Sequence, residues 1–213
     1  MKTGERFRRT WTLGYGGPSV DFVNTRWDRL KANPAESFVR AQDVLDWLRT
    51  RRLLGRRLHR RWAVRLHRSP RLGRQLLEHA VRLREALYGV FWSLAHREEP
   101  GAGHVRTVNR VLAMVRTHPR LTLRPGSHFT LTYRHDNNPL AELLGPIAVA
   151  AARLLSEEAR QRLRRCFNPE CGVIFFDRTK NKRRRWCHMK VCGSRIKMRR
   201  YRQRVRLGSR TTR

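Results

Sequence analysis

The chain has 213 residues and a formal net charge of +33, from 49 Lys and Arg against 16 Asp and Glu. Such an excess of positive charge is far beyond what solubility requires and indicates a polyanionic partner. No apolar run approaches the ~18 residues that span a bilayer, and residues 1–14 lack the apolar stretch of a signal peptide, so we expect a cytoplasmic protein with no membrane partner.

The charge is concentrated toward the C-terminus. Residues 160–213 contain 20 basic and 2 acidic residues, whereas residues 1–159 contain 29 and 14. Arginine supplies 43 of the basic residues, so a GC-rich genome is an alternative source of part of the N-terminal charge. The composition changes near residue 156, which predicts a domain over residues 1–156 and a small domain over residues 157–213.

The N-terminal segment over residues 14–25 reads as a Gly/Pro turn followed by a short strand with alternating apolar residues. Polar side chains lie toward its end at Asp21, Asn24 and Thr25. They form a candidate ligand pocket for an unknown small-molecule effector. The alternative is a structural role, in which the end of the strand caps the next turn.

Most of the N-terminal domain has helical periodicity. Apolar residues spaced by three and four positions predict helices over residues 41–54, 72–94 and 105–115. The helix over 72–94 has the most regular spacing. These segments supply the expected hydrophobic core.

Two alternating runs, residues 120–124 and 128–134, flank Pro125-Gly126 and predict a β-hairpin. Asn138 is expected to cap a further helix that has Pro139 at its first position. The predicted fold class is therefore α+β, with a mostly helical N-terminal domain and a small antiparallel sheet.

Four cysteines form two equally spaced pairs, Cys166-x4-Cys171 and Cys187-x4-Cys192, separated by fifteen residues. In a reducing compartment such pairs are metal thiolates and not disulfides. Iron–sulfur sites usually follow different spacings, which favours one Zn²⁺. Four thiolates leave no open coordination position, so this zinc is expected to be structural.

The residues around these cysteines are consistent with a treble-clef zinc finger. We expect a knuckle at residues 168–170, a hairpin through 173–176 and back through 183–186, and a helix after Cys192. Met198, Tyr201 and Val205 are expected to be the packing face of that helix.

The finger also carries two basic clusters, and no acidic residue follows Asp177. One cluster lies on the predicted hairpin, and the other forms a stripe on the last helix. Such clusters suit phosphate binding. The predicted nucleic-acid-binding residues are Lys180, Lys182, Arg183, Arg184, Arg185, Arg195, Lys197, Arg199, Arg202 and Arg206.

Three segments carry a family resemblance: Cys166 to Asp177, Arg184-Arg185-Trp186-Cys187 and Cys192-Gly193-Ser194-Arg195 resemble the CGNR zinc finger. The N-terminal part resembles the ABATE domain, in residues 20–25, 83–87, 109 and 145–155. The resemblance implies a stress-responsive transcription regulator whose treble-clef finger binds DNA. Ser194 stands where the family motif has Asn. Both residues can cap the N-terminus of a helix, so we expect the fold to be kept, but a base contact made by that Asn does not carry over to Ser194.

These observations favour a DNA-binding transcription regulator whose N-terminal domain senses an effector or forms a homodimer, with duplex DNA preferred over RNA. The alternative is an RNA- or ribosome-associated zinc protein, because an Arg-rich helix on a zinc knuckle suits RNA equally well. A nuclease would need a general base and further metal ligands. Within the finger only Asp177 and His188 could serve, so we do not expect an enzyme.

Overall fold

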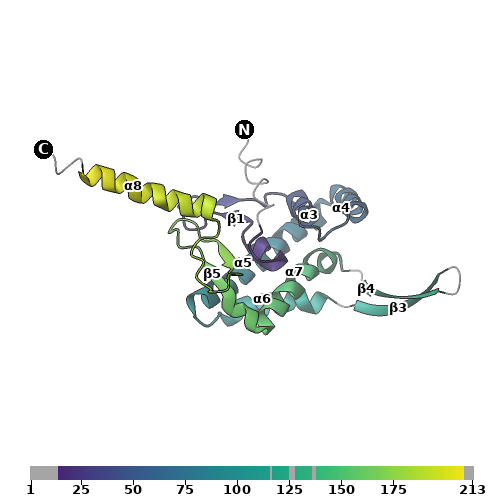
Figure 1. The fold of residues 1–213 in the computed structure, drawn as a ribbon. Helices are drawn as coiled ribbons and strands as arrows, with labels where there is room; N and C mark the ends of the chain where they lie inside the picture. The colour runs from purple at the N-terminus through teal and green to yellow at the C-terminus, as the bar shows by residue number, and fades with distance from the viewer. Residues whose placement is uncertain (1–13, 116, 125–127, 136–137, 209–213) are drawn as a thin grey trace.

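The computed structural model describes residues 14–115, 117–124, 128–135 and 138–208, and their fold is drawn in Figure 1. The helices are α2 (Pro18–Val23), α3 (Ala41–Thr50), α4 (Arg56–Arg68), α5 (Pro70–His96), α6 (Ala102–Met114), α7 (Pro139–Ser156) and α8 (Ser194–Gly208), with the short turns η2 (Glu158–Arg162) and η3 (Met189–Gly193). The strands are β1 (Arg26–Trp27), β2 (Ala35–Glu36), β3 (Thr117–Arg124), β4 (His128–His135), β5 (Leu163–Arg165) and β6 (Ile174–Phe176). Within the described residues they pair as two-stranded antiparallel sheets. The predicted α+β fold class is confirmed.

Helix α5 is the central element of the N-terminal domain. It begins as its sequence dictates, with Pro70 at the first position and the Ser69 hydroxyl accepting a hydrogen bond from the Leu72 amide. Its regularly spaced apolar residues, among them Leu76, Leu83 and Leu87, are fully buried. The helix predicted over 72–94 is thus confirmed and is slightly longer.

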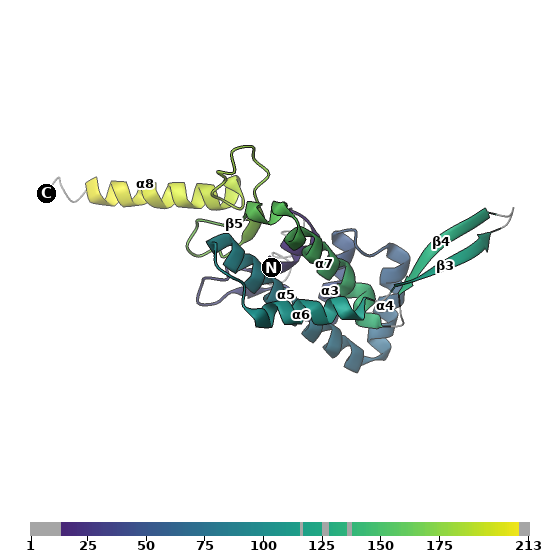
Figure 2. The same ribbon diagram turned by 90° about the horizontal axis from the view of Figure 1, so that it is seen from below.

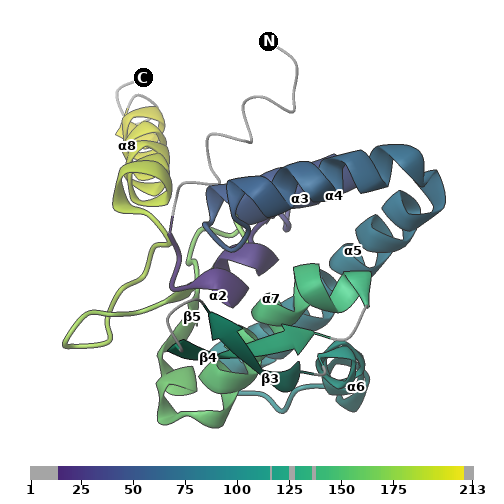
Figure 3. The ribbon, with the colours of Figure 1, turned by 90° about the vertical axis from the view of Figure 1, so that its right-hand side faces the viewer.

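Helices α3 and α4 contact each other, and both contact α5 (Figure 3). The helix predicted over 41–54 is confirmed as α3, although it already ends at Thr50. Helix α4 lay outside the predictions, because arginines outnumber its apolar residues. The buried residues of α4 form a narrow stripe, His59, Trp62 and Leu66, and Leu58 and Ala63 pack beside it, half-buried.

Helices α6 and α7 complete the domain. The Asn138 side chain accepts hydrogen bonds from the amides of Leu140 and Ala141, as predicted for the cap of α7. By length and apolar composition α7 could cross a membrane, contrary to the expectation that no segment would. It contacts α2, α5 and α6, and one of its faces is fully buried, which is how a core helix of a globular domain is built.

The hairpin predicted around Pro125-Gly126 is confirmed in its strands, β3 and β4, while the turn residues lie outside the described part of the chain. Strands β3 and β4 form a two-stranded ribbon, the β3–β4 ribbon, that projects from the body of the molecule (Figure 2). Leu123 pairs with Phe129, which places both on one face together with Leu121. These three side chains are 63–65% exposed.

The strand predicted within residues 14–25 is wrong, because the segment forms helix α2. Pro18 occupies the first helical position, where its missing N–H costs nothing. Val20, Phe22 and Val23 are all fully buried, so the segment has no exposed face. Five of the six residues of this short helix are buried, and such a segment gives a pattern that alternation cannot distinguish from a strand.

The hydrophobic core continues across the predicted boundary at residue 156. Leu163, Ile174 and Phe175 from the C-terminal region belong to the same buried cluster as Phe22 and Leu83. Helix α5 contacts both β5 and β6, and α2 contacts β6. The C-terminal region therefore packs against the helical domain through a shared apolar interface.

Candidate metal centre and nucleic-acid interface

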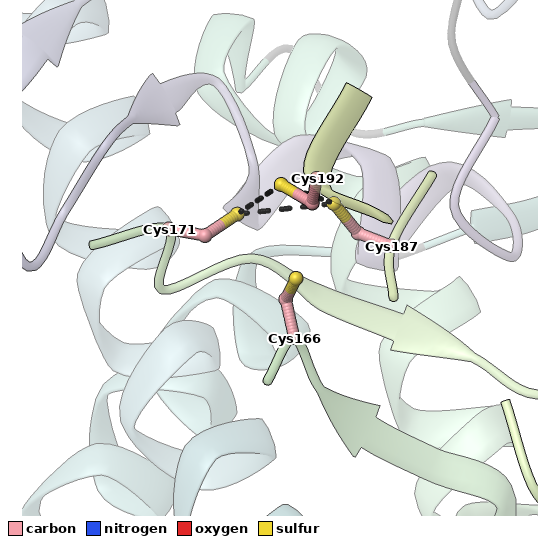
Figure 4. A group of neighbouring side chains, drawn as sticks. All are labelled: Cys166, Cys171, Cys187 and Cys192. Carbon is pink, nitrogen blue, oxygen red and sulfur yellow. Dashed lines mark hydrogen bonds between the residues drawn. The ribbon is translucent and has the colours of Figure 1, made fainter. Parts of the chain in front are cut away.

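The four cysteines converge on one point. Cys166, Cys171, Cys187 and Cys192 are buried, and their sulfur atoms all lie within 4.8 Å of one another (Figure 4). The sulfur atoms of Cys171, Cys187 and Cys192 are separated by 3.6 to 3.8 Å. A tetrahedral zinc with Zn–S bonds of ~2.3 Å requires S···S edges of ~3.8 Å. The donor set therefore has the size and chemistry that Zn²⁺ requires.

Their electrostatics also call for a cation. A hydrogen bond from Cys171 lowers the pKa of Cys166, and in turn the sulfur of Cys166 raises the pKa values of Cys171 and Cys187. Four sulfur atoms this close oppose ionisation of all four together. A divalent metal ion at their centre compensates the thiolate charges.

The loop between the first two cysteines is fixed by local chemistry. The Asn168 amide donates a hydrogen bond to the Cys192 sulfur at 3.5 Å, which orients that ligand and stabilises its negative charge. Gly172 has a φ of +65°, where a side chain would be strained, and a Cβ there would lie 2.8 Å from Arg29. The predicted knuckle thus needs glycine for its turn and for its contact with the helical domain.

The hairpin predicted between residues 173–176 and 183–186 is wrong in its partner. Strand β6 pairs with β5, with Arg165 opposite Ile174, and residues 183–186 contain no strand. A backbone hydrogen bond also joins the two sides of the loop that contains Cys166 and Cys171, because the Cys166 amide donates to the Val173 carbonyl. The basic run after residue 177 is consequently a loop.

Asn24 joins the helical domain to the finger. Its amide nitrogen donates to the Ile174 carbonyl at 2.6 Å, and its oxygen accepts from the Ile174 amide at 3.1 Å. The carboxamide acts on Ile174 as a neighbouring strand would. Asn24 is 2% exposed, so these bonds are shielded from water.

The other residues of the candidate ligand pocket are also bonded within the protein. Asp21 accepts hydrogen bonds from the Tyr15 amide and from Arg51, and the Thr25 hydroxyl donates to the Phe22 carbonyl. Asp21 and Thr25 are buried. The structure gives these side chains structural partners, and a ligand at this position stays a prediction.

A chain of polar contacts also connects α5 to the finger, and the sequence did not predict it. Glu85 binds Arg29 at 2.7 Å, the Arg29 guanidinium lies 3.8 Å from the Tyr88 ring centroid, and the Tyr88 hydroxyl donates to the Gly172 carbonyl. Burial opposes ionisation of Glu85, but the hydrogen bond and charge of Arg29, with help from Arg84, outweigh it and lower its pKa. Burial raises the pKa of Tyr88 to about 12, which keeps this donor protonated.

The basic loop over residues 178–185 is held by Asp177. One carboxylate oxygen accepts from the amide and hydroxyl of Thr179, and the other accepts from the Arg184 amide. Burial of Asp177 is outweighed by these bonds, and its pKa is lowered. The carboxylate thus closes the loop at both ends.

The predicted basic residues differ in what they can reach. Arg184 is turned inward, with its guanidinium bonded to the carbonyls of Trp186 and Cys187 and 4.7 Å from the Phe175 ring centroid. Arg199 lies 4.0 Å from Glu170 and is still largely exposed. The side chain of Arg206 lies outside the described residues. The exposed members of the set are Lys180, Lys182, Arg183, Arg185, Arg195, Lys197, Arg199 and Arg202.

Helix α8 extends away from the body of the protein, with its main contact at its first end, against η3 (Figures 1 and 2). The predicted packing of Met198, Tyr201 and Val205 is wrong, because these side chains are 51–58% exposed. Ser194 could have capped this helix, but it does not do so. Its backbone is already helical, and its hydroxyl donates to the Met189 carbonyl at 3.4 Å.

Two family models match the sequence. The ABATE model, described as "Putative stress-induced transcription regulator", matches residues 16–158. The model of the CGNR zinc finger matches residues 162–205 and includes all four cysteines. No curated protein matches the chain. The four cysteines are therefore the ligands of one structural zinc ion in a CGNR zinc finger.

Proposed function

The chain belongs to the ABATE family and ends in a CGNR zinc finger, and from this membership we propose that it is a zinc-dependent, DNA-binding transcription regulator. The observation that carries the proposal is α8, an exposed basic helix mounted directly on the metal centre. Cys192 lies in η3, the turn that leads into α8. The zinc thus fixes the base of the helix while the rest of the helix stays free for a partner.

The charges of α8 fit a duplex. Arg195, Arg199 and Arg202 recur every three or four positions, so they follow one line along the helix. Neighbouring positive charges repel one another, and an isolated helix of this length is marginal in water. Phosphates along a groove would relieve that repulsion, which explains why an unpacked helix can carry so many cations.

The test measures binding of the zinc-loaded chain to duplex DNA and to structured RNA at equal salt. The salt slope is the slope of the logarithm of the binding constant against the logarithm of the salt concentration. Alanine at Arg199 or Arg202 should lower its magnitude by about one unit, since each phosphate contact releases a counterion. Arg195 lies in the first turn, where a groove-inserted helix meets base edges, so Arg195→Ala should cost ~1–3 kcal/mol at one base position.

Arg110→Ala, an exposed position on α6, is the matched control and should leave binding unchanged. Unchanged affinity and slope in all three α8 variants would reject α8 as the binding surface. Tighter binding to structured RNA than to duplex DNA would favour the alternative, an RNA- or ribosome-associated protein.

We also propose that the regulator acts as a homodimer and that the β3–β4 ribbon is the contact. Its exposed Leu121, Leu123 and Phe129 form an apolar face, and two copies that pack through it would remove this surface from water. Sedimentation should give a dimer that Leu123→Lys converts to a monomer. A wild-type monomer at micromolar concentration would rule this contact out.

Finally, we propose a non-enzymatic, cytoplasmic role. Asp177, one of two residues of the finger that could serve a nuclease, uses both carboxylate oxygens to close its own loop. Absence of strand cleavage by the zinc-loaded chain with added Mg²⁺ is the expected result. Cleavage that is lost in Asp177→Asn would overturn it.

A further inference from the structure

Helix α4 carries a second basic surface, distant in sequence from the finger. Between Asp46 and Glu78 the chain has eleven arginines and no acidic residue. All of these arginines except Arg51 are exposed. Arg61 lies 3.5 Å from Glu142 and Arg65 lies over the Trp62 ring, but most of the others make no ion pair within the described residues.

Helix α4 has its arginines on one side and its buried side chains on the other. At 3.6 residues per turn, the six arginines of α4 fall within an arc of about 180°. The buried His59, Trp62 and Leu66 fall on the opposite side. The only exposed apolar residue within the basic arc is Val64. The packing of α4 on the core therefore orients every one of its arginines toward solvent.

Helix stability does not explain this pattern. Like charges four positions apart, such as Arg57 and Arg61, destabilise a helix, and a solvated face normally mixes acidic and basic residues. The first turn has Arg56 and Arg57 and no acidic residue, although the positive end of the helix dipole favours acids there. An anionic partner would screen the repulsion between the arginines, and it would supply the negative charge that the first turn lacks.

We propose that the α4 surface, formed by Arg56, Arg57, Arg60, Arg61, Arg65 and Arg68, binds the phosphate backbone of duplex DNA as a second anchor beside α8. This inference rests on the proposed function and extends its site to the ABATE domain. Helices α4 and α8 both lie on the upper side of the molecule in Figure 1, toward opposite ends. A duplex that contacts both would be held without sequence readout at α4, because phosphate contacts fix position and not sequence.

The test replaces three arginines near the centre of the arc, Arg57, Arg60 and Arg68, by glutamine in the zinc-loaded full chain. The probe is a random-sequence duplex of ~30 base pairs, titrated with salt. Loss of three phosphate contacts should lower the salt slope by up to ~2.7 units and weaken binding at least ~10-fold at ~0.1 M salt.

A second triple variant, with glutamine at Arg106, Arg110 and Arg153, is the matched control. These exposed arginines lie on α6 and α7, so the control removes the same net charge from other helices. It should retain the affinity and slope of the wild type to within the small change expected from net charge alone. Equal thermal unfolding of the two triple variants excludes a folding defect.

The outcomes separate this inference from the proposed function. If the α4 triple variant binds like its control while Arg199→Ala and Arg202→Ala are impaired, the α4 anchor is rejected and the proposed function stands. If neither set of variants affects duplex binding, both are rejected. If the α4 variant loses binding to phosphatidylserine vesicles but not to duplex, the surface belongs to a membrane and the proposal is overturned.

Discussion

Helices α4 and α8 have similar compositions, with basic residues at about half of their positions, but they are held in different ways. In α4 the apolar stripe is buried, and Trp62 is 1% exposed. In α8 the corresponding stripe is open, and Tyr201 is 58% exposed. An apolar stripe on a basic helix therefore identifies a surface that could be covered, but not whether the protein itself covers it. The position of α4 depends on the hydrophobic core, whereas that of α8 depends on the zinc centre at its base.

The largest effect is expected from metal removal. Cys171→Ser or a strong chelator should unfold the finger and detach α8, because structural zinc contributes on the order of 10 kcal/mol to such sites. Helix α4 should remain folded, so weak, salt-sensitive DNA binding should persist. Elemental analysis should give one zinc per chain for the wild type and for Ser194→Ala, a neighbouring control. Amide protection of Ile174 that survives chelation would contradict the dependence on zinc.

A pair of alanine variants tests most directly whether the apolar stripe is covered in α4 and open in α8. Trp62→Ala should destabilise the protein by ~3–5 kcal/mol, because it leaves a cavity in the core. Tyr201→Ala should change stability by less than ~0.5 kcal/mol. Urea unfolding of both variants measures the difference. A loss above ~1 kcal/mol in Tyr201→Ala would mean that the stripe of α8 is covered in solution.

The contact between the two regions predicts an intermediate effect. Asn24→Ala should cost ~1–3 kcal/mol, because it leaves the buried backbone groups of Ile174 without their side-chain partner. The loss should appear as faster amide exchange in β6, measured in the zinc-loaded protein. Asn109→Ala, at an exposed position on α6, is the control, and an equal effect from it would contradict the assigned contact.

The smallest effect concerns acid stability. Arg29 and Arg84 hold the pKa of Glu85 below its usual value, so this carboxylate stabilises the fold above pH ~4.3, the ordinary value in an unfolded chain. The contribution is lost as the pH falls through the lower folded-state pKa. Glu85→Gln should therefore be less stable than the wild type near neutral pH, and the difference should shrink toward pH 3. A constant difference over this range would show that the charge of Glu85 is not involved.

Local signals in the sequence were sufficient for much of this structure. The spacing of the cysteines predicted the zinc centre, the periodicity of residues 72–94 predicted α5, and the Asn138-Pro139 pair predicted the start of α7. Each of these patterns is governed by chemistry within a few residues. The α2 segment failed because burial on all sides gives helix and strand the same pattern.

The partners of β6 and of α8 could not be predicted for a different reason. Ile174 could pair with a later segment or with β5, and both are short and compatible with the pattern of the strand. The choice is made by contacts with α2 and α5, which lie more than 75 positions before β6 in the sequence. Whether Met198, Tyr201 and Val205 are covered likewise depends on the placement of the whole helix, which their spacing does not determine.

The bond between Asn24 and Ile174 has a consequence for biosynthesis. Its two ends are 150 positions apart, and at ~5–20 residues per second a ribosome needs about 8–30 s to add that many residues. During this time α2 and Asn24 have been synthesised, but the Asn24 carboxamide lacks the backbone that it binds in the finished fold. The nascent helical domain must therefore wait in a hydrated, incompletely closed state until the cysteine region appears. Zinc capture and closure of the interdomain face then become the last events of folding, so a shortage of zinc would leave the face around Asn24 exposed to water.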